Sequence, residues 1–180
     1  FEKVSRALPQ INTETLSIKK TISQSDISMR APVALLHFGR SGTGLMHSLI
    51  DNHPQISTLP GVYLKGYFES GVWDTLASQG VKKLPEQFTI LFKVLFNATD
   101  PTPVPGVVND DTSMLGVKDG MTAVGESHKD KLTIDRDIFC REAHRLMDQV
   151  GDINPGTFLR IVFQAYEVAL GNRKENPLLF

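Results

Sequence analysis

The chain has 180 residues, of which 41% are hydrophobic and 22% are charged, and this size and balance are typical of one globular domain rather than of a fibrous or disordered chain. A formal net charge of −1 excludes the strong basic field that would favour a nucleic acid as partner. The single cysteine, Cys140, excludes an internal disulfide framework and a cysteine-based zinc site, and it fits a reducing, cytoplasmic location.

The first 30 residues are polar and rich in serine, threonine and lysine, and we expect them to form a lead-in to a domain that occupies residues 31–180. Apolar runs at 88–96 and 158–170 are interrupted by charged residues and are too short for a bilayer, so we expect no membrane span. The last residues, "NPLLF", are typical of a strand that is cut short. We therefore expect residues 31–180 to be the N-terminal part of a longer domain.

Residues 31–38, "APVALLHF", form a nearly continuous apolar run, which is typical of a strand buried on both faces of a parallel sheet. From Thr43 the pattern becomes helical and continues to a stop before Pro54. Four apolar residues recur there at the spacing of one helix face: Leu45, Met46, Leu49 and Ile50. The sequence thus predicts a strand, a tight turn and a helix.

The spacing of apolar residues predicts four further helices, over residues 67–78, 85–97, 134–150 and 155–170. Pro155 and Gly171 suit the start and the stop of the last helix. A short second strand fits residues 55–59, whereas the proline-rich residues 99–111 must form a loop. Together these patterns predict an α/β fold with a central parallel sheet flanked by helices, and a P-loop-like turn after the first long strand.

The segment "FGRSGTGLM", residues 38–46, places a glycine-rich turn between the predicted strand and helix. Such a turn is an anion site because unpaired backbone N–H groups of the first helical turn converge there and the helix dipole favours negative charge. Ser41 and Thr43 add hydroxyl donors, and Arg40 adds a positive charge that can donate two parallel hydrogen bonds. These residues predict a site for phosphate or sulfate.

Two common phosphate-binding patterns do not fit this turn. The Walker pattern requires lysine and then serine or threonine directly after its second glycine, where this chain has Leu45 and Met46, so a magnesium-dependent NTPase or kinase of that type is disfavoured. The dinucleotide pattern requires three glycines, and when it is started from Gly42 the third position is His47.

The stretch "FGRSGTGLMHSLIDNHPQI" resembles the 5′-phosphosulfate-binding loop of the sulfotransferases that use 3′-phosphoadenylyl sulfate, and it is most similar to the tyrosylprotein and bacterial branches of that superfamily. The resemblance implies that six residues wrap the phosphosulfate: Arg40, Ser41, Gly42, Thr43, Gly44 and Leu45. Arg40 would also act in catalysis, by stabilising the charge that develops on the bridging oxygen as the sulfuryl group leaves. Gly44 departs from the pattern, because the family usually has a second threonine there.

The family's other anion site, which holds the 3′-phosphate, is not found in the sequence. That site uses an arginine and a later serine after a strand. The nearest candidate is Arg136, but His144 stands where the serine is expected and the segment has a helical pattern. If the chain is the N-terminal part of a longer domain, the 3′ site lies beyond Phe180 and the piece alone would be inactive.

The catalytic base, which must take the proton of the acceptor hydroxyl, is also open at this stage. Glu69 is the closest carboxylate downstream of the His-Pro pair, and it is our first candidate for the base. His47, His53 and His128 are weaker candidates. Lys65 could steady a sulfate oxygen, although a solvated lysine accounts for it equally well.

By this resemblance, the sequence predicts a sulfotransferase that moves a sulfuryl group from 3′-phosphoadenylyl sulfate to a hydroxyl or amine of a small-molecule, glycan or peptide acceptor, without a metal. Two alternatives stay open: a nucleotide-dependent, kinase-like phosphotransferase with a variant phosphate loop, and a non-catalytic anion-binding module. Magnesium-dependent binding of ATP would mark the first alternative. The sequence motifs do not identify the acceptor or the oligomeric state.

Overall fold

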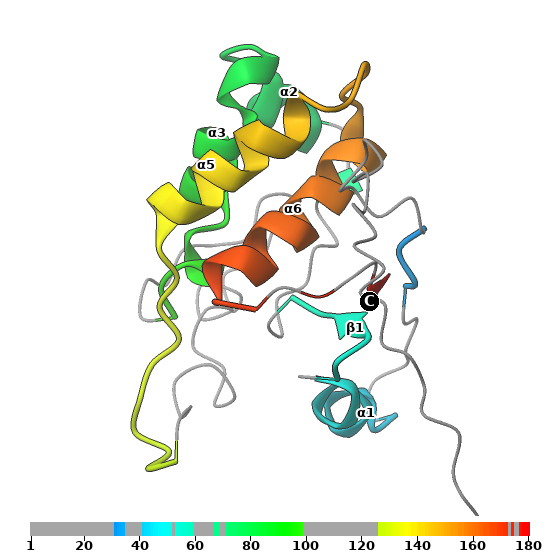
Figure 1. Ribbon diagram of the computed structural model, residues 1–180, viewed down its shortest axis with the longest axis vertical. Helices are drawn as coiled ribbons and strands as arrows, with labels where there is room; N and C mark the ends of the chain where they lie inside the picture. Colours follow the sequence, from blue (N-terminus) through cyan, green and yellow to red (C-terminus); the bar gives the residue numbers. More distant parts are fainter. Residues whose placement is uncertain are drawn as a thin grey trace, which may run out of the picture.

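The structure, a computed structural model, describes residues 31–34, 41–51, 53–59, 67–68, 71–98, 126–172, 174 and 177–180. In these residues the chain is mostly helical and carries a small parallel sheet of two strands (Figure 1). The predicted mixture of helices with parallel strand pairing is confirmed at this level. In chain order the elements are α1 (Thr43–Ile50), β1 (Ile56–Ser57), α2 (Val72–Ala77), η2 (Val81–Lys83), α3 (Leu84–Leu91), η3 (Lys93–Leu95), α5 (Arg136–Met147), α6 (Pro155–Ala169) and β2 (Leu178–Leu179).

Helices α2, α3, α5 and α6 form the main body of the described chain, and α5 lies along α6 (Figure 1). The two long helices begin where the sequence caps them. The Asp135 carboxylate accepts the backbone N–H groups of Asp137 and Ile138 at the start of α5. The Asn154 side chain accepts the N–H of Thr157 at the start of α6. These bonds satisfy first-turn donors that have no partner within the helix, so α6 starts at Pro155 as predicted, whereas α5 starts at Arg136 and not at residue 134.

Phenylalanine rings fill the core between these helices. Phe88 of α3 stacks on Phe92 and Phe139 with ring centroids 4.6 and 5.8 Å apart, and it meets Phe158 edge to face at 6.0 Å. All four side chains are buried, and each contributes roughly 1.5–3 kcal/mol through the apolar surface that it removes from water. The buried aromatic side chains of residues 88–96 therefore belong to the core.

The sheet pairs β1 and β2 in parallel, with Ile56 opposite Leu178 and Ser57 opposite Leu179. At the other edge of β2, the carbonyl oxygen of Leu179 accepts the backbone N–H of Val33 at 2.8 Å. The last strand in the chain therefore lies between β1 and residues 31–34. Residues 31–34 precede both strands in the chain but bond to β2 and not to β1.

The prediction of a long first strand is wrong over the part that the structure describes. Residues 31–34 make that one bond to the sheet but are not a strand, and Val33 is 43% exposed, whereas we predicted burial on both faces over residues 31–38. A segment at the edge of a short sheet is covered less than a central strand, which accounts for this exposure. Residues 35–38 lie outside the described residues.

Helix α1 lies on the opposite side of β1 from α6 in Figure 1. The helix and its stop before Pro54 are confirmed, but its apolar face is not buried. Leu45 and Leu49 are 68% and 74% exposed, Met46 is exposed and Ile50 is half-buried. Helix α1 packs extensively on none of the other described helices. The periodicity therefore predicted the element correctly and its burial wrongly.

The remaining predicted helices are present with changed ends. Helix α2 begins at Val72, after a left-handed Gly71, and not at residue 67. Helix α3 ends at Leu91, and a turn of 3₁₀ helix, η3, follows it. The predicted stop of α6 at Gly171, where φ is 80°, is confirmed. Within the described ranges, no helix has the length and apolar character needed to cross a membrane.

Candidate functional site

The predicted anion turn, residues 40–45, is described from Ser41 onward and leads directly into α1. Gly42 is the N-cap of α1 and has φ 76° and ψ 13°, a left-handed conformation that glycine adopts without steric cost. The carbonyl oxygen of Gly42 accepts the first backbone bond of the helix, from the N–H of Met46, at 3.0 Å. Because glycine has no side chain, this cap provides no acceptor for the first-turn N–H groups, which suits an external anion.

The surroundings of this turn are open. Among the residues that the structure describes, a Cβ atom added at Gly42 or Gly44 would meet no atom within 4 Å. Ser41, Gly44 and Leu45 are all exposed. A ligand could therefore approach the backbone of the turn closely. At Leu45 such a ligand would contact the backbone N–H, because the leucine side chain has no hydrogen-bonding group.

The structure brings five of the predicted donor-binding residues together in this turn: Ser41, Gly42, Thr43, Gly44 and Leu45. The two residues predicted to act in catalysis, Arg40 and Glu69, lie outside the described residues, as does Lys65. The assignment of the site therefore depends on the turn and on the start of α1.

The described histidines do not lie at the turn. His47 is half-buried in the last turn of α1, and His53 follows the far end of that helix, which at 1.5 Å per residue is about 12 Å long. The Nδ1 atom of His53 accepts the backbone N–H of Gln55 at 3.2 Å, so its ring closes the turn into β1. His128 is exposed in the loop before α5.

The segment that we compared with the 3′-phosphate site is helical, as its pattern indicated. Arg136 is the first residue of α5 and is exposed. His144, in the last turn of α5, lies 3.1 Å from Oε1 of Glu86 in α3. An arginine in a helix and a histidine bonded to a carboxylate do not make the strand-to-helix anion site that the family uses.

Glu86 and His144 connect α3 to α5. Partial burial would raise the pKa of Glu86, but hydrogen bonds from its own backbone N–H and from His144, together with the charges of His144 and Lys83, outweigh the burial and lower that pKa. The pair is partly exposed and joins α3 to α5, and neither residue belongs to the turn.

Cys140, also on α5, carries a thiol that is difficult to ionise. Burial raises the pKa of its thiol to about 11, and the carboxylates of Glu86 and Asp137 add to that effect. The thiolate fraction near neutral pH is therefore very small. No three His, Cys, Asp or Glu side chains are grouped for a metal in the part of the chain that the structure describes.

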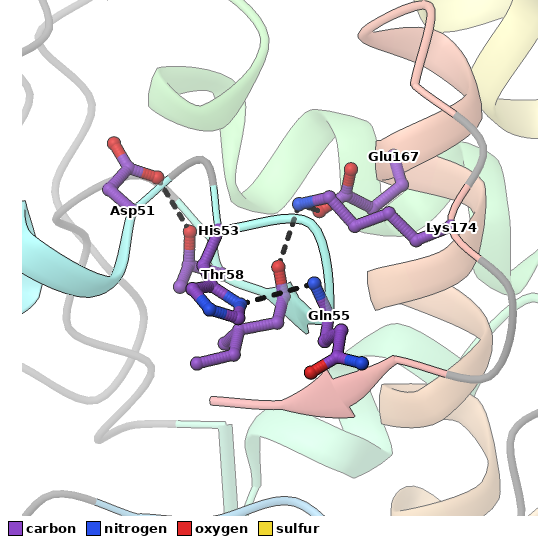
Figure 2. A network of polar contacts seen from close by, with 7 residues as sticks. Asp51, His53, Gln55, Thr58, Glu167 and Lys174 are labelled. Atoms are coloured by element: carbon purple, nitrogen blue, oxygen red, sulfur yellow. Dashed lines mark hydrogen bonds and ion pairs between the residues drawn. The ribbon is translucent and has the colours of Figure 1, made fainter. Parts of the chain in front are cut away.

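A polar network that sequence reasoning missed lies around β1 (Figure 2). The Thr58 hydroxyl donates to Oδ1 of Asp51 at 2.8 Å, which connects the end of β1 to the end of α1. On the other side of the strand, Lys174 lies between Glu167 of α6 and β1, and its ammonium group donates to the Ile56 carbonyl oxygen at 2.7 Å. The seven-residue spacing of Glu167 and Lys174 across Gly171 is the one signal in the sequence that could have indicated this pair.

Comparisons with protein-family models, with curated proteins and with solved structures find no match to this chain. The functional assignment accordingly depends on the residues of the turn and their geometry.

Proposed function

We propose that the chain is the donor-binding part of a sulfotransferase that uses 3′-phosphoadenylyl sulfate, and that residues 40–45 hold the 5′-phosphosulfate. The observation that carries the proposal is the left-handed Gly42 at the N-cap of α1, inside the sequence "RSGTG", where a Cβ atom would meet nothing within 4 Å in the described part of the chain. A backbone of this kind presents first-turn N–H groups to a bound anion. The neighbouring Arg40 and hydroxyl residues supply the charge and the additional donors.

The arrangement of the sheet agrees with this proposal. Residues 31–34, which lead toward the turn, bond to β2, while the next strand in the chain, β1, lies on the other side of β2. A chain order of this kind is typical of open parallel α/β sheets, where ligands bind at the carboxyl ends of strands whose connections diverge. We propose that the described sheet is part of a larger parallel sheet with the anion turn at its carboxyl edge.

In the proposed reaction, an acceptor oxygen or nitrogen attacks the sulfur of the donor in line with the bridging oxygen. The new bond to sulfur forms as the bond between sulfur and the bridging oxygen breaks, and adenosine 3′,5′-bisphosphate leaves. Arg40 and the turn N–H groups stabilise the negative charge on the bridging oxygen. Glu69 is the proposed acceptor of the proton released from the attacking group.

A thermal-shift titration tests the proposal and its alternatives with three ligands: 3′-phosphoadenylyl sulfate, adenosine 3′,5′-bisphosphate, and ATP with magnesium. A ligand that binds only the folded chain at a hundred times its Kd adds about 2.7 kcal/mol to the free energy of unfolding. We expect stabilisation by the first two ligands, which Arg40→Ala reduces. Arg141→Ala, at an exposed position on α5, is the matched control and should bind as the wild type does.

Each alternative function has its own result in that titration. Preference for ATP with magnesium would support the kinase-like phosphotransferase. Inorganic sulfate and phosphate are therefore added as further ligands: stabilisation by them that equals stabilisation by the nucleotides would support a non-catalytic anion-binding module, because the turn would then recognise only the charge.

A further inference from the structure

The chain reverses sharply between α6 and β2. The backbone N–H of Gly171 donates to the Val168 carbonyl oxygen, and the N–H of Asn172 donates to the Glu167 carbonyl oxygen, which is the Schellman pattern of helix termination. The left-handed Gly171 makes this turn possible. As a result, Lys174 returns to the last full turn of the helix that it has just left.

Lys174 and Glu167 form a buried ion pair at this place. The ammonium nitrogen of Lys174 lies 3.0 Å from Oε1 of Glu167, and the two side chains are only 11% and 6% exposed. Burying two charges is costly unless hydrogen bonds satisfy them as well. The second bond of Lys174, to the Ile56 carbonyl oxygen, is of that kind and is the contact that reaches the sheet (Figure 2).

The Ile56 carbonyl lies on the outer edge of β1. The carbonyl oxygens of Gln55 and Ser57 accept from the N–H groups of Leu178 and Phe180 in β2. Since successive carbonyls of a strand point to opposite sides, the Ile56 carbonyl points away from β2. Lys174 therefore caps the edge of β1 and fixes this strand against the end of α6.

From β1 the contacts continue to both segments that flank the anion turn. Thr58 bonds to Asp51 at the end of α1, the helix that the turn begins. Through β2, the carbonyl oxygen of Leu179 holds the N–H of Val33 in the segment that precedes the turn. The ion pair is thus joined by a continuous series of bonds to the chain on each side of residues 40–45.

We propose that Glu167 and Lys174 are positioning residues for the anion turn: they hold β1 and β2 in the register that places residues 31–34 and α1 on either side of the bound phosphosulfate. The identity of the ligand in this inference rests on the proposed function, whereas the coupling between the ion pair and the turn does not depend on it. Neither residue touches the donor.

Amide hydrogen exchange, followed residue by residue, tests the coupling without any ligand. In Lys174→Met, the N–H groups of Val33 and Met46 should exchange about tenfold faster than in the wild type, because they depend on the sheet and on the start of α1. The N–H of Phe139, which bonds to Asp135 in α5, should change less than about twofold. Lys82→Met, at an exposed lysine, is the matched control and should change none of the three.

The double variant Glu167→Gln/Lys174→Met separates positioning from overall stability. It leaves no buried charge without a partner, so its melting temperature should return toward that of the wild type, but it still lacks the bond to the Ile56 carbonyl. Fast exchange at Val33 and Met46 should therefore persist, and the Kd for 3′-phosphoadenylyl sulfate should stay about five- to tenfold weaker than in the wild type.

Unchanged exchange rates at Val33 and Met46 in both variants would overturn the proposal. An increase of the exchange rate at Phe139 that equals the increase at Val33 and Met46 would also overturn it, because the pair would then only stabilise the whole fold. If the wild type does not bind 3′-phosphoadenylyl sulfate, the proposed function fails, and the exchange rates still decide the coupling.

Discussion

Replacing Gly42 by alanine should open the start of α1, whereas the same change two residues later should not. At φ 76° an alanine side chain costs about 1–2 kcal/mol relative to a right-handed conformation, and the loss of unfolded-state freedom returns about 0.4–1 kcal/mol. The net local destabilisation is therefore about 1 kcal/mol. Gly44 has no such φ and lies in the first turn of the helix, where alanine is preferred to glycine by up to about 1 kcal/mol. In both places the added Cβ has free space, so sterics with neighbouring atoms do not enter the comparison.

Hydrogen exchange at the N–H of Met46, which closes the first turn of α1 on Gly42, reads this difference directly. A change of about 1 kcal/mol corresponds to about a fivefold change in local opening. Exchange should be about fivefold faster in Gly42→Ala, and equal to or slower than wild type in Gly44→Ala. Equal effects of the two changes, in either direction, would refute the left-handed cap and the description of the turn that depends on it.

Three further predictions concern the turn and the helical layer. Gly44→Thr restores the hydroxyl that the sulfotransferase family usually has at this position. Because one hydrogen bond contributes about 0.5–1.5 kcal/mol, calorimetry should show that this variant binds 3′-phosphoadenylyl sulfate about two- to tenfold more tightly than the wild type does. Gly44→Val, which adds no hydroxyl, should bring no gain in affinity. The pKa of Glu86 is lowered by folding, so the contribution of Glu86 to stability is present above about pH 4.5 and is lost as the pH falls through the lower folded value. The free energies of unfolding of the wild type and of Glu86→Gln, measured in urea, should therefore differ at pH 7 and converge in acid. A difference that grows in acid would contradict the pairing. Cys140, with a thiol pKa of about 11, should react with iodoacetamide at pH 8 at least about tenfold more slowly in the folded chain than in urea, and equal rates would contradict its burial.

The sequence predicted those parts of the fold that depend on neighbouring residues. Pro155 at the start of α6 and the stop at Gly171 are local signals, and α6 lies where we expected it, whereas α5 (Arg136–Met147) is shorter at both ends than the predicted range of 134–150. The start of α1 after the glycine-rich turn is local in the same sense. Backbone groups at helix ends need partners within a few residues, so the signal and the structure lie together.

The features that the sequence did not predict depend on distant parts of the chain. The apolar stripe of α1 has the period of a buried face, yet Leu45 and Leu49 are exposed, because burial is decided by what packs on the helix. The edge of β1 is capped by Lys174, which is 118 residues away from Ile56 along the chain. No periodicity encodes a contact of that separation.

The central claim, that residues 40–45 bind the phosphosulfate, is tested most directly by an NMR titration of the ¹⁵N-labelled chain with 3′-phosphoadenylyl sulfate. The largest and saturating shifts should fall on the N–H groups of Gly42, Thr43, Gly44 and Leu45, and they should disappear in Arg40→Ala while persisting in Arg141→Ala. Shifts that leave these four N–H groups unchanged, or that are largest elsewhere, would contradict the claim.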